Sequence, residues 1–181
     1  MKSYYILSAI GKDRPGIVAD VSEVIYECGG NIEDSNMGLL RTHFALLILF
    51  SAEKEEIDQK LSVRLKRLEW EKRLTVFFRP LEGEPVPYAV TQHAAPYELQ
   101  AVGVDKAGIV ARLARCLASH NINITQMSTS SRPEPGTGTP IYHMRVRMEV
   151  PGDVDPNVLR TELDGIAESL HIDLSFQPPK D

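Results

Sequence analysis

Residues 11–19 read GKDRPGIVA, and residues 103–111 read GVDKAGIVA. An offset of 92 residues superimposes these two stretches, and at that offset 11 of the 28 positions from Tyr5 to Ile32 are identical to those from Tyr97 to Ile124, without a gap. Chance does not keep so many identities in register, so the chain is an internal duplication. Its 181 residues are sufficient for two small domains.

Each copy carries the same order of local signals around the shared stretch. The β-branched and apolar run Tyr4–Ile10 predicts a strand that stops at Gly11. Apolar residues then recur every three or four positions until Gly29 and Gly30, which predicts an amphipathic helix with a glycine stop. The other expected elements are strands over 31–41, 43–50 and 74–78 and a helix over 57–68; in the second copy, strands over 99–104, 122–132, 141–150 and 172–176 and helices over 109–120 and 158–170.

This βαββαβ order has few three-dimensional solutions, because both helices must bury their apolar stripes on one face of the sheet. The sequence therefore predicts an α+β fold of two tandem ferredoxin-like modules, each with an antiparallel four-stranded sheet. The expected boundaries are 1–80 for the first module and 96–178 for the second. Residues 81–95 are rich in proline and lack any periodicity, which is typical of a stiff linker.

The two predicted sheets differ in their third strands. Phe44–Phe50 is apolar on both faces, which predicts a strand covered on both sides. Residues 142–150 instead alternate apolar with charged side chains, so this sheet should present one polar face. Prolines and glycines over 132–140 exclude regular structure there and predict a mobile hairpin tip, either a surface excursion or a flap over a neighbouring site.

Composition and charge exclude several classes of protein. The net charge of −5 argues against broad contact with nucleic acid or anionic membrane, and the basic run 64–67 is interleaved with glutamates nearby, as on a solvated helix face. Cys28 and Cys116 have no paired spacing, which indicates reduced thiols in the cytoplasm. Because no apolar run approaches the length of a membrane span, we expect neither export nor insertion.

The junction between first strand and first helix is the candidate site. The unpaired N–H groups and positive dipole end of a helix N-terminus suit a small carboxylate, and Asp13 or Asp105 could meet the ammonium group of an amino acid. Either aspartate could instead simply cap its helix. Asn31 and Asn123 lie fifteen residues after their glycines, at the start of the second strand, where asparagine is also a common turn residue.

The segment Asp13–Val18, followed by Gly29–Ile32, resembles the ACT domain, a small regulatory βαββαβ module that senses amino acids, usually at an interface between two modules. Two such modules without a catalytic domain resemble the glycine cleavage system transcriptional repressor family, which makes glycine the suggested effector. The resemblance implies that the turn aspartate and the strand asparagine contact the effector. The predicted ligand-binding residues are Asp13, Gly16, Ile17 and Asn31, with Asp105, Gly108, Ile109 and Asn123.

The leading hypothesis is a cytoplasmic, non-catalytic regulator in which an amino acid bridges a helix N-terminus of one module and a strand start of its neighbour. It would act on a regulatory protein partner, as a homodimer, in amino-acid or one-carbon metabolism. The alternative is an interaction or dimerisation module with vestigial ligand sites. An enzyme centred on His43 or His143 is the third possibility, although no acid, base and nucleophile set converges.

Other chemistry finds little support in the sequence. The five histidines show no i,i+4 spacing among themselves, so no metal site is expected. No nucleophile elbow and no phosphate loop occur, so we expect neither catalysis nor a cofactor.

Overall fold

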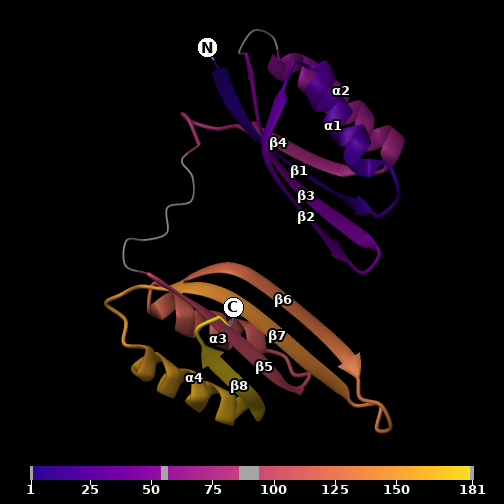
Figure 1. Ribbon diagram of the computed structural model, residues 1–181. Helices are drawn as coiled ribbons and strands as arrows, with labels where there is room; N and C mark the ends of the chain where they lie inside the picture. The colour runs from indigo at the N-terminus through magenta and orange to yellow at the C-terminus, as the bar shows by residue number, and fades with distance from the viewer. Residues whose placement is uncertain (1, 54–56, 86–93, 180–181) are drawn as a thin grey trace. The chain divides into compact units, whose positions relative to one another are not determined.

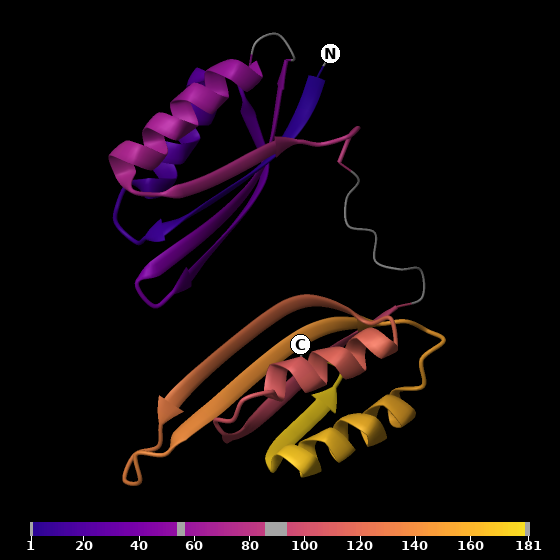
Figure 2. The same ribbon diagram turned by 180° about the vertical axis from the view of Figure 1, so that it is seen from behind.

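The computed structural model describes residues 2–53, 57–85 and 94–179. The chain divides into two compact units, Met1–Pro87 and Tyr88–Asp181, which we call module 1 and module 2 (Figures 1 and 2). Of the predicted linker, residues 86–93 lie outside the described residues, and the part before them contains bends at 82–84.

Both modules have the element order βαββαβ (Figure 1). Module 1 consists of β1 (Lys2–Lys12), α1 (Ile17–Glu27), β2 (Asn31–Leu40), β3 (His43–Glu53), α2 (Ile57–Lys72) and β4 (Thr75–Pro80). Module 2 consists of β5 (Ala95–Val104), α3 (Ile109–Ser119), β6 (Asn123–Pro133), β7 (Pro140–Val150), α4 (Pro156–Leu170) and β8 (Ile172–Gln177).

The sheets are four-stranded and antiparallel, in the orders β2-β3-β1-β4 and β6-β7-β5-β8. In each module both helices lie on one face of the sheet (Figures 1 and 2). This is the α+β ferredoxin-like sandwich that the sequence predicted. The second strand of each copy, β2 or β6, is an edge strand.

Each module has its own hydrophobic core between the sheet and the helices. In module 1 the inward side chains of β3 alternate along the strand and meet the helical stripe that includes Val21 and Leu61. Module 2 repeats this packing with the inward residues of β7 against Leu113 and Leu159. Burying one such leucine contributes roughly 1.5–3 kcal/mol relative to leaving it in water, so these stripes hold the helices on the sheet.

The ends of the first helices follow the glycine rule in one copy and an asparagine variant in the other. After α1, Gly29 adopts φ +80° and the Gly30 N–H donates to the Ile25 carbonyl at 2.9 Å. After α3, Asn121 takes the left-handed position with φ +54°, which asparagine tolerates better than most residues. The chain therefore reverses at the same point in both copies.

Three sequence expectations need correction. The first strand does not stop at Gly11 but continues to Lys12, because Gly11 is still paired with Phe44. The hairpin after β6 is more regular than expected, since strand pairing continues to Pro133 and Pro140. The third is the double coverage predicted for the third strand of module 1, which module 1 by itself does not provide.

That strand, β3, is buried on one face only. Phe44, Leu46 and Ile48 point into the core, whereas Ala45 and Leu47 are exposed on the opposite face, Leu47 to 48%. Module 1 by itself therefore leaves the leucine-bearing face of its sheet uncovered.

Candidate functional site

The turn between β1 and α1, and its counterpart between β5 and α3, have the same backbone geometry. Gly16 has φ 90° and ψ −6°, and Gly108 has φ 99° and ψ −7°. A side chain is disfavoured at such positive φ, so both glycines are required by the backbone of the turn. Their carbonyl groups accept the first helical hydrogen bonds, from the N–H of Asp20 and of Arg112 respectively.

Neither of these helices has a side-chain cap. The N-cap residue is the glycine itself, and no side chain accepts a hydrogen bond from the first turn in either α1 or α3. By contrast, the Asp155 side chain caps α4 by accepting from the Asn157 N–H at 2.8 Å. The first-turn N–H groups of α1 and α3 therefore remain available for an anion.

The capping role considered for Asp13 and Asp105 is wrong, because no side chain accepts a hydrogen bond from the first turn of α1 or α3; the backbone of each aspartate instead contacts a neighbouring hairpin. The Asp13 N–H donates to the Thr42 carbonyl at 2.8 Å, and the Asp105 N–H donates to the Pro140 carbonyl at 2.9 Å. These bonds tie each turn to the end of the neighbouring hairpin. Both aspartate side chains are exposed at the surface.

Ile17 and Ile109 cannot offer their side chains to a ligand at the surface. Both are buried in the module cores, with 3% and 2% of their surface exposed. Only their N–H groups, in the first turn of each helix, remain for ligand contact.

Charged residues around the two turns differ, and the sequence reasoning did not single them out. In module 1, Arg14 Nη2 lies 2.6 Å from an Asp20 carboxylate oxygen, and Lys72 Nζ lies 3.3 Å from the other. The hydrogen bond from Arg14, helped by Lys72, holds the pKa of Asp20 below its usual range. In module 2, Arg112 occupies the position of Asp20 at the offset of 92 residues. The first turn of α1 is therefore acidic, whereas that of α3 is basic. The alignment of the two copies already shows this difference in charge.

Each asparagine lies at the opposite end of its sheet from the turn. Lys12, next to Asp13, is opposite His43 on β3, whereas Asn31 is opposite Ser51. Eight residues of strand at roughly 3.3 Å each separate these two levels by about 26 Å. Module 2 has the same spacing along β7. One small ligand cannot contact both predicted groups within one module.

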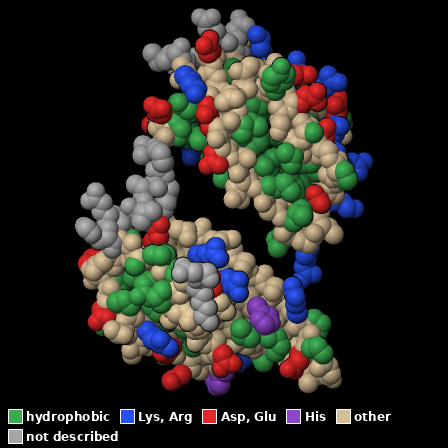
Figure 3. Space-filling model, in the orientation of Figure 1, with side chains coloured by type: hydrophobic (Ala, Val, Ile, Leu, Met, Phe, Trp, Pro, Cys, Tyr) green, Lys and Arg blue, Asp and Glu red, His purple; other side chains and the backbone are tan. Residues whose placement is uncertain are grey.

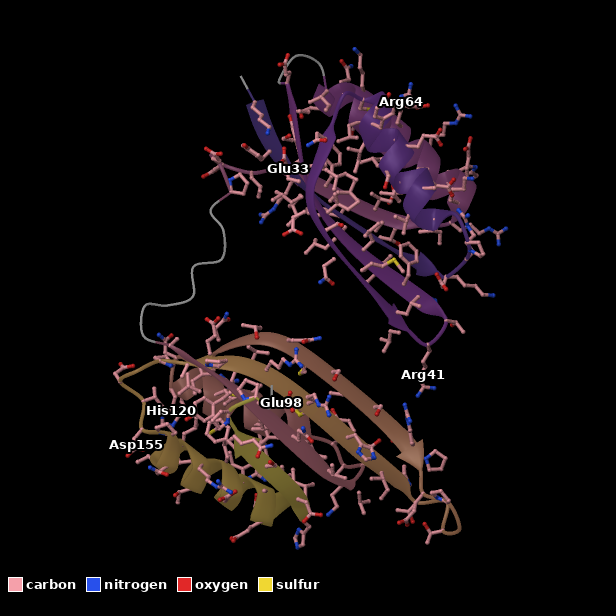
Figure 4. The ribbon with its side chains drawn as sticks, in the orientation of Figure 1. Glu33, Arg41, Arg64, Glu98, His120 and Asp155 are labelled. Carbon is pink, nitrogen blue, oxygen red and sulfur yellow. The ribbon has the colours of Figure 1, made fainter. Side chains whose placement is uncertain are left out.

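Asn31 belongs to a polar network that the sequence reasoning missed. Glu33, at a β-bulge two residues later, accepts hydrogen bonds from the Ser51 hydroxyl at 2.5 Å and from Asn31 Nδ2 at 3.5 Å (Figure 4). Lys2 Nζ lies 2.8 Å from the same carboxylate. The Lys2 and Ser51 hydrogen bonds lower the pKa of Glu33 to about 2. The bulge recurs in module 2 at Thr125, where no carboxylate is present.

Gly11 and Gly103 are explained by packing rather than by ligand contact. A Cβ at Gly11 would lie 2.6 Å from a methyl carbon of Leu74, and one at Gly103 would lie 2.7 Å from a methyl carbon of Ile172. The absence of a side chain there lets the first strand lie against Leu74, directly before β4, and against Ile172, the first residue of β8.

The open sheet faces of the two modules carry different side chains (Figure 3). In module 2, Arg145 and Arg147 lie beside Glu98, with closest nitrogen to oxygen distances of 3.6 Å and 3.4 Å (Figure 4). A hollow of about 460 Å³ lies on this face and includes His143 and Arg132 in its lining. This charged face confirms the alternation predicted for residues 142–150.

One group of potential metal ligands occurs among the described residues. It consists of Cys116, His120 and Glu162, whose ligand atoms all lie within 4.8 Å of one another. The histidine spacings gave no hint of it, because the partner of His120 on its own helix is a cysteine. Within the described ranges, no helix is both long and apolar enough to cross a membrane.

The sequence pattern of the ACT domain matches residues 3–79. Module 1 resembles an ACT domain over nearly its whole length. The ACT fold is repeated in module 2, which has the same element order and strand order, so the chain consists of two tandem ACT-like modules.

Similar proteins match this chain over most of its length. The glycine cleavage system transcriptional repressor of Escherichia coli (strain K12) is 27% identical over 158 residues, covering 84% of this chain and 77% of that protein. The crystal structure of an unknown protein from Galdieria sulphuraria has a TM-score of 0.78 at 25% identity and covers 99% of this chain and 100% of its own. A crystal structure provisionally assigned as a glycine cleavage system transcriptional repressor has a TM-score of 0.72 at 22% identity, covering 100% of this chain and 99% of that one.

Proposed function

We propose that this tandem ACT protein is a non-catalytic regulator that binds a small amino acid at its two glycine turns and thereby changes its contact with a partner protein. The observation that carries the proposal is the repeated turn geometry. Each turn joins an uncapped helix N-terminus to an exposed aspartate, which suits the carboxylate and the ammonium group of one zwitterion. The E. coli relative, named a repressor of the glycine cleavage system, supports glycine as the effector.

The edge strands offer a way to bring turn and asparagine together across two modules. If a second module pairs antiparallel along β2, its strand begins beside the Leu40 end of the first. The turn between β1 and α1 lies at this same end of the sheet, because the Asp13 N–H donates a hydrogen bond to the Thr42 carbonyl in the hairpin after Leu40. The asparagine of one module would then approach the turn of the other, which a single module does not allow.

The two turns should differ in their affinity for the carboxylate of the ligand. Arg112 adds a positive charge in the first turn of α3, where module 1 has the ion-paired Asp20. An exposed ion pair, such as Arg112 could form with a bound carboxylate, is worth about 0.2–1 kcal/mol. We therefore propose that module 2 binds the carboxylate more tightly than module 1.

Calorimetric titration of the full chain with glycine and the other proteinogenic amino acids tests the proposal. Asp105→Ala should abolish the tighter phase and Asp13→Ala the weaker one, whereas Asn31→Ala and Asn123→Ala should each weaken binding at the turn that the asparagine approaches. Asp153→Ala, which removes an exposed aspartate in a different turn, is the matched control. Absence of heat and of any thermal shift with every amino acid would reject ligand sensing.

The second candidate is a pure dimerisation module, and the edge of module 1 favours it. All of β2 is exposed, including Leu39 at 59% and Leu40 at 74%, and a long exposed edge strand readily pairs with another chain. Sedimentation should show a dimer that Leu39→Lys weakens. If that dimer is indifferent to amino acids and to Asp13→Ala and Asn31→Ala, the interaction role is favoured over the sensor.

A further inference from the structure

Three different ligand types meet on the helical layer of module 2. Cys116 and the helix-ending His120 are one turn apart along α3, and Glu162 projects from the adjacent α4. The Cys116 thiol lies 3.7 Å from Glu162 Oε2, and His120 Nε2 lies 2.8 Å from the same oxygen. Figure 4 labels His120 on this side of the module.

These distances are close to those of a coordinated ion. With Zn–S near 2.3 Å and Zn–N or Zn–O near 2.0–2.2 Å, tetrahedral coordination places ligand atoms about 3.3–3.7 Å apart. The sulfur to oxygen distance already fits. The nitrogen to oxygen distance must open by about 0.5 Å, which the partly exposed His120 and the exposed Glu162 can provide by side-chain rotation.

The donor set selects the metal. A thiolate, an imidazole and a carboxylate together suit zinc, whereas calcium and magnesium prefer oxygen ligands only. Three protein ligands leave a fourth position for water or an anion, and a hollow of about 640 Å³ adjoins Cys116 and Glu162.

The charges around this position also favour an anionic fourth ligand. Arg112 and Arg115 line the same hollow. Zinc with one thiolate and one carboxylate is electrically neutral, so the two arginines would attract an anion to the metal rather than oppose a net positive site.

We propose that Cys116, His120 and Glu162 bind Zn²⁺ on the helical layer of module 2, with a fourth position open to the adjoining hollow. The three ligand residues are separate from the glycine turns, and the zinc proposal does not rest on the proposed amino-acid sensing. Module 1 has Val24 and Cys28 at the positions aligned with Cys116 and His120, so it lacks the triad. The duplication therefore supplies an internal comparison.

The test is titration of the reduced, metal-free full chain with Zn²⁺ by calorimetry and with Co²⁺ by absorption spectroscopy. We expect one ion per chain and a thiolate-to-cobalt charge-transfer band. Glu162→Gln and His120→Gln should each weaken zinc affinity by more than about tenfold, a loss seen even for outer-shell partners of metal ligands. Cys116→Ser should remove the charge-transfer band.

Cys28→Ser is the matched control, because it removes the other thiol and leaves the triad intact. It should leave both the stoichiometry and the band unchanged. Binding of no zinc by the full chain, or zinc binding unaffected by Glu162→Gln and His120→Gln, would overturn the proposal. These two residues are not buried, so the decision does not depend on whether Cys116→Ser folds. Amino-acid calorimetry on the same metal-free protein scores the sensing proposal independently.

Discussion

At the scale of single residues, adding a Cβ should have opposite effects on stability at the glycines of the two turns and at the glycine inside α4. Gly108 has φ 99°, and a Cβ there would have no atom within 4 Å, so any penalty comes from the backbone alone. Gly165 lies within the helix α4 and also has open space around it. Replacing glycine with alanine should therefore lower the free energy of unfolding at Gly108 and raise it at Gly165.

We expect Gly108→Ala to destabilise the protein by about 1–2 kcal/mol, the cost of a left-handed conformation for an L-residue. Gly165→Ala should stabilise it by about 0.5–1 kcal/mol, because alanine loses less conformational entropy in a helix. Urea denaturation of both variants measures the difference. Equal effects would show that positive φ does not explain the turn glycine.

Protonation of Glu33 should account for part of the stability that the protein loses at acid pH. Its pKa in the fold is about 2, below the ordinary 4.5, so the ionised carboxylate stabilises the folded state. The sign follows from linkage: this stabilisation is complete above pH 4.5 and is lost as the pH falls towards 2. Glu33→Gln should be less stable than wild type at pH 7, and the difference should vanish near pH 2.

Urea midpoints of wild type and Glu33→Gln between pH 7 and pH 2 measure this effect. Lys2→Met removes the largest cause of the low pKa and should reproduce part of it. Parallel curves for wild type and Glu33→Gln would contradict the assignment.

At the scale of elements, the helices begin in two ways. α4 starts with Asp155 as a side-chain cap and Pro156 in its first turn, whereas α1 and α3 start at a bare glycine. We expect Asp155→Ala to cost about 0.5–2 kcal/mol, as for other cap residues. Asp13→Ala and Asp105→Ala should cost much less, since neither side chain caps a helix.

Thermal melting distinguishes the two kinds of start. A loss of about 1 kcal/mol corresponds to roughly 4–8 °C for a module of this size. Were Asp13→Ala to lower the melting temperature as much as Asp155→Ala, the aspartate would be structural and its proposed contact with ligand would lose support.

Elements and their order could be predicted from the sequence, because apolar periodicity and the glycine stops are local signals. Boundaries were less accurate: β5 begins at Ala95, before Pro96, although the sequence predicted a start at Leu99. At the edge of the periodic run, pairing with β7 extends the strand through residues whose own signals are weak.

The candidate site was harder to predict, because it depends on distances that no local pattern contains. Asp13 and Asn31 are near in sequence, yet the helix between them returns along the whole sheet and separates them. Conversely, Cys116 and Glu162 are 46 residues apart and become neighbours through helix packing. The i,i+4 spacing of Cys116 and His120 was the one visible hint.

At the scale of the whole molecule, the duplication produced two units with separate cores. Each core is built from its own sheet and its own pair of helices. Domains of this size can fold alone when they have such a core.

We therefore expect fragments 1–87 and 88–181 each to unfold cooperatively when expressed alone, each with the secondary structure seen in the full chain. Circular dichroism with thermal and urea denaturation measures this. A fragment that remains unfolded, or melts without a cooperative transition, would mean that its core is incomplete without the other module.

Because the two open sheet faces carry different side chains, binding to each face should respond differently to salt. Contacts made through the exposed leucines on the open face of module 1 should hold their strength from dilute buffer to concentrated sodium chloride, since an apolar side chain carries no charge for salt to screen. Contacts made through the arginine-bearing face of module 2 should fade over the same range. Binding measured at several salt concentrations should therefore show which of the two modules contacts a given partner.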